Sequence, residues 1–277
     1  MIGQKELIKL VKSQIKNKDF PRFSIIVGAR GSGKKSLTDI ITKTMKLNYS
    51  YRSGIAVSQV RDAISQMYKS VDTTVFTFYD ADEMSVQAKN ALLKVAEEPP
   101  HNVHIIMTVT DLNNVLSTIK SRAFIYRMEP YSPKDLIKYA SEYGKTMNGK
   151  LITDLCETPG DVNMLHDCNA QALYNYATLT VDNIAEVSDA NALKLGSKIA
   201  FKDDDSGFDM LLFLKAFRQI CMDRMCTAII DGVQEEINRY ASGVDAVNHT
   251  ISQLHITGIN KSHIFDMFIL DIRKVWK

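Results

Sequence analysis

The sequence contains no apolar run that approaches the length of a membrane-spanning helix. Its first twenty residues place lysines among apolar positions at helical spacing, so they also lack the unbroken apolar stretch that a signal peptide needs. These lysines are Lys5, Lys9, Lys12, Lys16 and Lys18. Both absences favour a compact, soluble protein that carries neither a membrane span nor an export leader.

Cysteine and histidine are scarce and poorly placed for metal chemistry. The four cysteines include no CxxC pair, and Cys221 and Cys226 are five positions apart, which puts them on different faces of a helix. None of the six histidines stands at the HExxH spacing. The sequence therefore predicts no metal centre and no hydrolase of the usual kinds, and it favours a reduced, cytoplasmic compartment.

Charge is unevenly distributed along the 277 residues. Residues 1–50 carry eleven Lys/Arg against three Asp/Glu, which makes that segment +8 and, from the net charge of +2, leaves −6 for the remainder. A basic segment permits contact with phosphates, although solvated basic helix faces are common. The apolar share of 45% is ample for sizeable cores, and the length favours about two domains.

Helical and strand patterns alternate up to about residue 129. Short apolar runs rich in β-branched residues indicate buried strands at residues 23–27, 74–79, 103–109 and 124–128. Helical patterns precede and separate these runs; Ser85 can cap one helix, which Pro99 and Pro100 must end. This order implies parallel βαβ units, whose ligands bind beyond the carboxyl ends of the strands.

The sequence beyond Pro130 predicts a series of consecutive helices. Ser132 and Pro133 provide an N-cap followed by proline at the first helical position. Longer helical patterns follow at residues 207–231, 234–254 and 261–277, with no strand pattern between them. We therefore expect an α/β domain at residues 1–129, a small helical domain at 130–180 and an all-helical domain at 181–277.

A glycine-rich GxxxxGK segment directly follows the first predicted strand and precedes a helix. In that context the glycines let successive backbone N–H groups surround a phosphate at the helix N-terminus. The alternative is a strand-to-helix turn that binds nothing. The predicted nucleotide-binding residues are Gly28, Gly31, Ser32, Gly33, Lys34, Lys35 and Ser36. Lys35 stands where a hydroxyl should bind Mg²⁺, and Ser36 is one residue late and turned by about 100°.

Acidic residues follow the second predicted strand, where a P-loop NTPase holds its metal-binding aspartate and catalytic acid. Spacing alone nominates Asp80 and Asp82 for these roles. The alternative is that both acids only solvate the end of the strand.

The segment from Ser85 to Pro100 contains the runs Asn90-Ala-Leu-Leu-Lys94 and Glu97-Glu-Pro-Pro100. It closely resembles the helix that is typical of AAA+ clamp-loader subunits. The resemblance extends to Ile2-Gly3-Gln4, to Thr108-Val-Thr110-Asp111 and to Leu116-Ser-Thr-Ile-Lys-Ser-Arg122, and it covers residues 1 to about 165. The resemblance implies an AAA+ P-loop core, a helical lid and an all-helical, oligomerising collar.

Alignment on this family changes the interpretation of the acids. It places Tyr79 at the metal-binding aspartate, Asp80 at the catalytic glutamate, Thr110 at sensor 1 and Asn163 at the sensor 2 arginine. A general base contributes about 10²- to 10⁴-fold and a phosphate-contacting donor about 10²- to 10³-fold, so hydrolysis in this pocket should be negligible. ATP or ADP remains an expected ligand, with weak or absent Mg²⁺. No zinc is expected, because the family's four-cysteine module has no counterpart in residues 37–78.

Arg122 matches the family's arginine finger, which reaches into the ATP site of a neighbouring subunit; as an isolated residue it would instead read as a cap on a short helix. A chain that keeps the arginine finger but has lost the metal-binding residues of its own ATP pocket resembles the delta-prime class of the DNA polymerase III clamp loader. The resemblance implies a hetero-oligomeric ring with other loader subunits, a sliding clamp and primed DNA as partners, and Arg61 and Lys89 as candidate DNA contacts. The alternatives are an active ATPase subunit of a clamp loader or helicase loader, and an adaptor that uses neither nucleotide nor Arg122.

Overall fold

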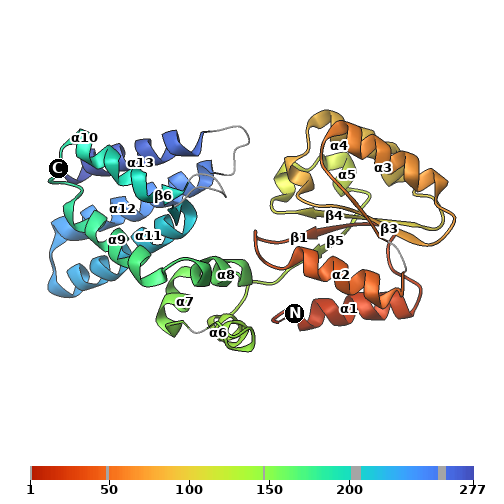
Figure 1. Cartoon of the computed structure of the whole chain (residues 1–277), viewed down its shortest axis with the longest axis horizontal. Coiled ribbons are helices and arrows are strands. Elements are labelled where there is room, and N and C mark those ends of the chain that lie inside the picture. The colour runs from red at the N-terminus through yellow and green to blue at the C-terminus, as the bar shows by residue number, and fades with distance from the viewer. Residues whose placement is uncertain (1, 48–49, 146, 201–206, 255–259) are drawn as a thin grey trace. The chain divides into compact units, whose positions relative to one another are not determined.

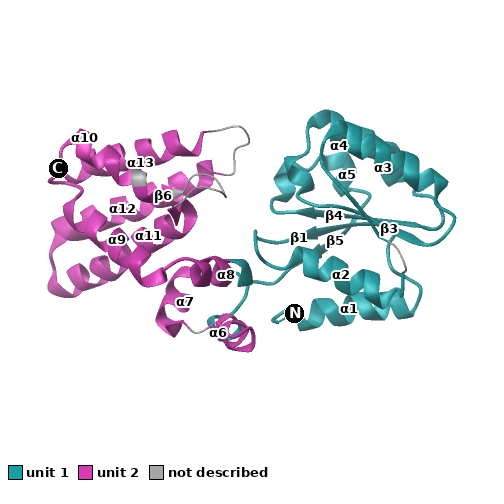
Figure 2. Cartoon of the chain, in the orientation of Figure 1, with its two compact units in different colours: residues 1–135, 158–160 teal, residues 136–157, 161–277 magenta. Residues whose placement is uncertain are grey.

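The computed structural model describes residues 2–47, 50–145, 147–200, 207–254 and 260–277. Within these ranges the chain forms two compact units (Figure 1, Figure 2). Unit 1 comprises Met1–Asp135 and Thr158–Gly160, and unit 2 comprises Leu136–Glu157 and Asp161–Lys277. The finer division into three domains at residues 129 and 180 stays a prediction.

Unit 1 is built on a five-stranded parallel sheet with the order β2-β3-β4-β1-β5. The strands are β1 (Phe23–Val27), β2 (Ser50–Ser53), β3 (Thr74–Phe78), β4 (Val103–Val109) and β5 (Phe124–Arg127). The helices are α1 (Lys5–Lys16), α2 (Lys34–Thr44), α3 (Val57–Lys69), α4 (Val86–Glu97) and α5 (Ser117–Lys120). Four of the strands were predicted, and β2 was not.

Successive residues of each strand pack alternately into two hydrophobic cores, one on each face of this sheet. Ile25 packs in the core beneath α3, α4 and α5, whereas the next residue, Ile26, packs in the core beneath α1 and α2. The same alternation places Phe76 in the first core and Val75 in the second. Figure 1 shows the resulting three layers, with α3 and α4 on one face and α1 and α2 on the other.

Two helices begin or end at the capping residues and prolines that the sequence indicated. The Ser85 side chain accepts a hydrogen bond from the backbone N–H of Ala88 at the start of α4, and α4 ends at Glu97, shortly before Pro99. Ser132 caps the helix α6 (Pro133–Glu142), because its Oγ accepts a hydrogen bond from the backbone N–H of Asp135. These caps confirm the predicted boundaries of both helices.

Unit 2 is mostly helical. Its helices are α6 (Pro133–Glu142), α7 (Gly149–Leu155), α8 (Pro159–Asp167), α9 (Ala170–Asn183), α10 (Asp189–Leu193), α11 (Met210–Asp231), α12 (Gln234–Gln253) and α13 (Lys261–Trp276), with α6 and α8 beginning in residues assigned to unit 1. Apolar faces of α11 and α13 pack on one another, with the rings of Phe213 and Phe265 5.6 Å apart between centroids and those of Phe217 and Phe268 5.3 Å apart. Packing within the unit therefore accounts for these apolar stripes.

The prediction of an all-helical region beyond residue 181 was wrong in one respect. A two-stranded parallel ladder joins β6 (Ile199–Ala200) to β7 (Phe208–Asp209). Each strand has only two residues, which is too short to produce an alternating pattern in the sequence. None of the helices in the described ranges is long and apolar enough to cross a membrane.

Candidate functional site

The glycine-rich loop runs from the end of β1 to the start of α2. Gly31 and Gly33 have φ values of 77° and 93°, a conformation that residues with a side chain rarely adopt. Gly31 also lies close to backbone, because a Cβ at this position would stand 2.8 Å from the Cα of Gly160. The carbonyl oxygen of Gly31 accepts a hydrogen bond from the backbone N–H of Gly160 at 3.0 Å. Sequence and backbone geometry thus agree on a P-loop.

Lys34 is folded back onto this loop. Its Nζ donates to the carbonyl oxygens of Gly28 at 2.7 Å and Ala29 at 3.1 Å, and it lies 3.4 Å from Oγ1 of Thr110. Burial lowers the pKa of Lys34, an effect that the nearby carboxylate of Asp80 opposes. The structure therefore brings the predicted phosphate-binding lysine and the predicted sensor 1 residue together.

Lys35 and Tyr79, which stand at the two positions where the family resemblance predicts metal ligands, contact each other. The Nζ of Lys35 lies 5.1 Å from the centre of the Tyr79 ring, and the guanidinium carbon of Arg52 lies 6.0 Å from it. Thr38 donates from Oγ1 to the carbonyl oxygen of Lys35 at 2.7 Å, so its 3.0 Å contact with Tyr79 is donated by the tyrosine hydroxyl.

Thr38 was not among the predicted site residues. Its spacing of three from Lys35 on a predicted helix was the signal available in the sequence. The other predicted residues of α2 and the loop sit apart from this cluster: Ser36 is exposed, and Ser32 is buried with its Oγ 3.3 Å from the Sδ of Met128.

This arrangement does not fit Mg²⁺. An ammonium group occupies the position of the hydroxyl ligand, an aromatic ring occupies that of the aspartate, and the hydroxyls of Thr38 and Tyr79 are already paired. Among the described residues, no group of three or more His, Cys, Asp or Glu side chains could hold a metal ion.

The two acids nominated by spacing have different surroundings. Asp82 accepts through Oδ2 from the backbone N–H groups of Thr110 at 2.9 Å and Asp111 at 3.0 Å, so it ties the loop after β3 to the loop after β4. Asp80 has a φ of 51° and donates from its backbone N–H to Oγ1 of Thr108. Asp82 therefore has a structural task, whereas Asp80 is the acid with the stronger electrostatic effect on Lys34.

The position of Lys89 argues against its candidacy as a DNA contact. Only 7% of Lys89 is exposed, and its Nζ donates to the carbonyl oxygens of Asp82 at 2.9 Å and Asn114 at 2.6 Å. A phosphate would have to displace both internal acceptors, so we interpret Lys89 as a positioning residue that joins α4 to these loops. Arg61, the other candidate, is exposed on α3.

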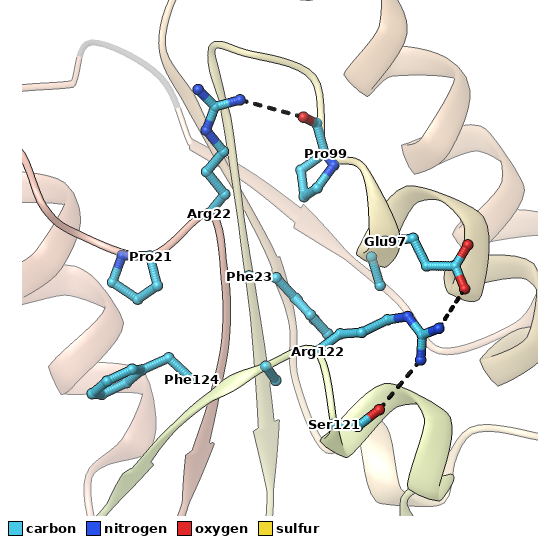
Figure 3. Close-up of a pocket in the computed structure, with 10 residues that line it drawn as sticks. Pro21, Arg22, Phe23, Glu97, Pro99, Ser121, Arg122 and Phe124 are labelled. Atoms are coloured by element: carbon cyan, nitrogen blue, oxygen red, sulfur yellow. Dashed lines mark hydrogen bonds and ion pairs between the residues drawn. The ribbon is translucent and has the colours of Figure 1, made fainter.

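Arg122 lies two residues before the start of β5, at the amino-terminal edge of the sheet. Its guanidinium contacts Glu97, the last residue of α4, at 2.8 Å and donates to Oγ of Ser121 at 3.2 Å (Figure 3). It also donates to the carbonyl oxygen of Thr118 at 2.7 Å. About a third of its side chain, 36%, is exposed. Arg122 thus caps α5 and also presents part of its guanidinium to the surface.

An open hollow of about 360 Å³ surrounds this arginine. Arg22 and Phe23, at the start of β1, form one side of it, and Glu97 and Pro99, at the end of α4, form another (Figure 3). Glu97 was quoted in the sequence motif but given no role, because nothing in a helical sequence shows that its end meets a residue 25 positions later.

Asn163, the predicted sensor 2 position, belongs to unit 2. Its Oδ1 accepts a hydrogen bond from the hydroxyl of Tyr139 at 3.1 Å, which joins α8 to α6. The preceding Asp161 pairs with Lys215 of α11 at 3.0 Å, and both side chains are buried. The segment after Pro159 therefore holds helices of unit 2 together.

The family model for the DNA polymerase III delta subunit matches residues 45–132, the stretch that contains Tyr79, the Asn90–Pro100 motif and Arg122. DNA polymerase III subunit gamma of Buchnera aphidicola subsp. Schizaphis graminum is 24% identical over 169 residues, which cover 50% of this chain and 47% of that protein. The replication factor C small subunit of Sulfolobus acidocaldarius is 23% identical over 206 residues, or 68% of this chain and 62% of that protein. The chain thus spans about half to three fifths of these relatives.

Solved structures show the same fold. A DNA polymerase III gamma subunit-related protein from Thermotoga maritima superposes with a TM-score of 0.53 at 16% identity, covering 98% of this chain and all of that one. A mutant of Thermotoga maritima RuvB gives a TM-score of 0.51 at 15% identity over 83% of this chain and 77% of that one. The parallel sheet and the P-loop agree with the AAA+ fold, and the matched family model and these relatives make the chain similar in sequence to clamp-loader subunits.

Proposed function

We propose that this chain is a delta-prime-like subunit of a DNA clamp loader, which supplies Arg122 to the ATP site of a neighbouring subunit and hydrolyses little or no ATP in its own pocket. The other loader subunits, a sliding clamp and primer-template DNA would be its partners. ATP or ADP would bind at residues 28–36. This role implies a cytoplasmic, hetero-oligomeric assembly.

The position of Arg122 relative to the P-loop is the observation that carries the proposal. The P-loop follows the carboxyl end of β1, whereas Arg122 lies beside the amino end of β1, next to Arg22 and Phe23. A strand of five residues spans roughly 16 Å, so Arg122 is too distant to contact a phosphate in the chain's own pocket. An exposed guanidinium on this edge is available only to another molecule, which supports a role in trans.

The second part of the proposal rests on the loss of metal ligands. With Lys35 and Tyr79 in contact where Mg²⁺ would bind, the pocket lacks the cation that stabilises charge during phosphoryl transfer. An arginine supplied to a neighbour is worth about 10³- to 10⁵-fold in that neighbour's rate. Loss of metal ligands in this chain's own pocket and retention of Arg122 therefore together favour ATP hydrolysis in the neighbouring subunit and not in this one.

A loader reconstituted with an active ATPase subunit tests this function. The variant Arg122→Ala should reduce ATP turnover at the interface by about 10³-fold or more. Arg61→Ala, which removes an exposed arginine from α3, is the matched control and should leave turnover unchanged when DNA is omitted. Unchanged turnover with Arg122→Ala would leave the adaptor interpretation in its place.

An ATPase subunit that uses Asp80 is the second candidate function. The effect of the Asp80 carboxylate on Lys34 favours it, because an acid close to the P-loop lysine could serve as a metal ligand or a base. Turnover by the isolated chain separates the two: sustained Mg²⁺-dependent hydrolysis, abolished by Asp80→Asn, would favour this candidate over the proposed one.

A further inference from the structure

The contact between Lys35 and Tyr79 replaces a metal site with a fixed positive charge. P-loop NTPases hold Mg²⁺ with the hydroxyl that follows the P-loop lysine and with an aspartate after the neighbouring strand. Lys35 and Tyr79 occupy these two positions, and the ammonium lies 5.1 Å from the ring centre. An ammonium held on the face of an aromatic ring is a stable arrangement, and Tyr79 therefore orients the cation.

Hydrogen bonds fix the ring itself. The Tyr79 hydroxyl donates to Oγ1 of Thr38, and this threonine donates in turn to the carbonyl oxygen of Lys35. The ring, the threonine and the lysine backbone thus form one connected group on α2 and the end of β3. Arg52, which pairs with Asp39 at 2.7 Å, lies against the same ring.

Charged groups of both signs surround the P-loop lysine. Burial lowers the pKa of Lys34, the carboxylates of Asp80 and Asp82 oppose this effect, and the weaker influence of Arg30 and Lys35 adds to it. An anion that binds beside Lys34, Lys35 and Arg30 would be attracted by these three positive charges. The loop glycines add backbone N–H donors of the kind that bind phosphate.

We infer that the P-loop binds a nucleoside di- or triphosphate without a divalent metal, and that the Lys35 ammonium, held by Tyr79, supplies the positive charge that Mg²⁺ supplies in related ATPases. This inference rests on the proposed binding of nucleotide by this P-loop. It adds the form of the ligand: the metal-free polyphosphate, bound for structural purposes and not for turnover.

Titration calorimetry of the full chain with ATP tests the inference directly. ATP should bind in EDTA, and its affinity there should equal or exceed that in MgCl₂, because Mg²⁺ sequesters the metal-free polyphosphate and no protein ligand contacts the metal. Binding that requires Mg²⁺ would overturn the inference. Absence of binding under both conditions would overturn it equally.

Variants test the assigned roles. Lys35→Ala should weaken ATP binding in EDTA by about tenfold, the effect of losing one charge-assisted contact. Lys43→Ala removes an exposed lysine near the other end of α2 and should leave the affinity unchanged. Equal affinities for both variants would show that Lys35 plays no part, provided that thermal unfolding confirms both are folded.

The double variant Lys35→Ser with Tyr79→Asp restores both metal ligands. Its ATP affinity should become Mg²⁺-dependent, with binding in MgCl₂ at least about tenfold tighter than in EDTA. A double variant that stays indifferent to Mg²⁺ would contradict the assignment of these positions.

Failure of this inference is distinguishable from failure of the proposed function. Activation of a partner ATPase depends on Arg122 at the opposite edge of the sheet, so it is measured separately from ATP binding by this chain. Metal-dependent or absent ATP binding, combined with a large effect of Arg122→Ala, would reject the metal-free site and leave the arginine role standing.

Discussion

Arg122 and Glu97 form an ion pair, with Nη2 and Oε1 2.8 Å apart, between the segment that leads into β5 and the last residue of α4. The side chains are 36% and 49% exposed, so the pair is worth about 0.2–1 kcal/mol. A guanidinium that reaches a neighbour's phosphate has to leave this carboxylate. The ion pair therefore competes with the role that we propose for Arg122.

Replacing the carboxylate tests that competition. Glu97→Gln should raise ATP turnover by the partner subunit, by up to about fivefold at subsaturating concentrations of this chain, because about 1 kcal/mol of competing attraction is removed. Turnover titrated against the concentration of this chain is the measurement. A fall of more than tenfold would instead mean that Glu97 holds Arg122 in its active position.

Lys89 is predicted to stabilise the fold. In Lys89→Met the carbonyl oxygens of Asp82 and Asn114 lose their buried donor, which should reduce the free energy of unfolding by about 1–3 kcal/mol. Chemical denaturation measures this loss. A variant as stable as the parent chain would mean that the two carbonyls find other donors.

Arg61 is the matched control on the neighbouring helix, and it also tests DNA contact. Arg61→Ala should change the free energy of unfolding by less than about 0.5 kcal/mol, because the side chain is exposed. If Arg61 contacts a phosphate in the assembled loader, the slope of log affinity against log salt should fall in magnitude by about one. An identical slope would remove Arg61 from the candidate contacts.

Strong periodic patterns carried the prediction of the fold. The buried runs around Ile25, Phe76 and Ile105 are apolar on both faces, as central parallel strands require, and were predicted. Strand β2, with the sequence Ser-Tyr-Arg-Ser, lies at the edge of the sheet and has only Ser53 buried, so it gives no such pattern.

Contacts between distant segments limited the prediction of the site. The altered residues Lys35 and Tyr79 were found from their positions in two motifs, but their contact depends on how α2 packs beside the end of β3. The burial of Lys89 was not predicted for the same reason. A lysine on a helix is usually solvated, and the carbonyls that bury this one come from loops that only the folded sheet brings together.

The four cysteines should differ sharply in reactivity. Burial raises the pKa of Cys156 and of Cys221 to about 12, so little thiolate is present at neutral pH, whereas Cys226 is exposed on α11. Iodoacetamide at pH 8 should therefore label Cys226 first, and Cys156 and Cys221 only after unfolding. Mass spectrometry of peptides over a time course measures the order. Early labelling of Cys221 in the folded chain would contradict the packing of α11 against its neighbours.

The ion pair between Lys215 and Asp161 should contribute more to stability than any exposed pair in unit 2. Both side chains are almost fully buried, at 8% and 9% exposed, and the Oδ2 of Asp161 that accepts from Lys215 at 3.0 Å also accepts from the backbone N–H of Glu157. Lys215→Met leaves a buried carboxylate without its cation, which should cost about 3–5 kcal/mol.

Arg218→Ala is the matched control for this pair, because Arg218 pairs one turn further along α11 with Glu157, whose side chain is 64% exposed. That change should cost less than about 1 kcal/mol, since an exposed pair is solvated with or without its partner. Chemical denaturation of both variants gives the comparison. Equal losses would mean that the buried carboxylate of Asp161 is satisfied without Lys215, and that the junction of α8 with α11 depends on apolar packing instead.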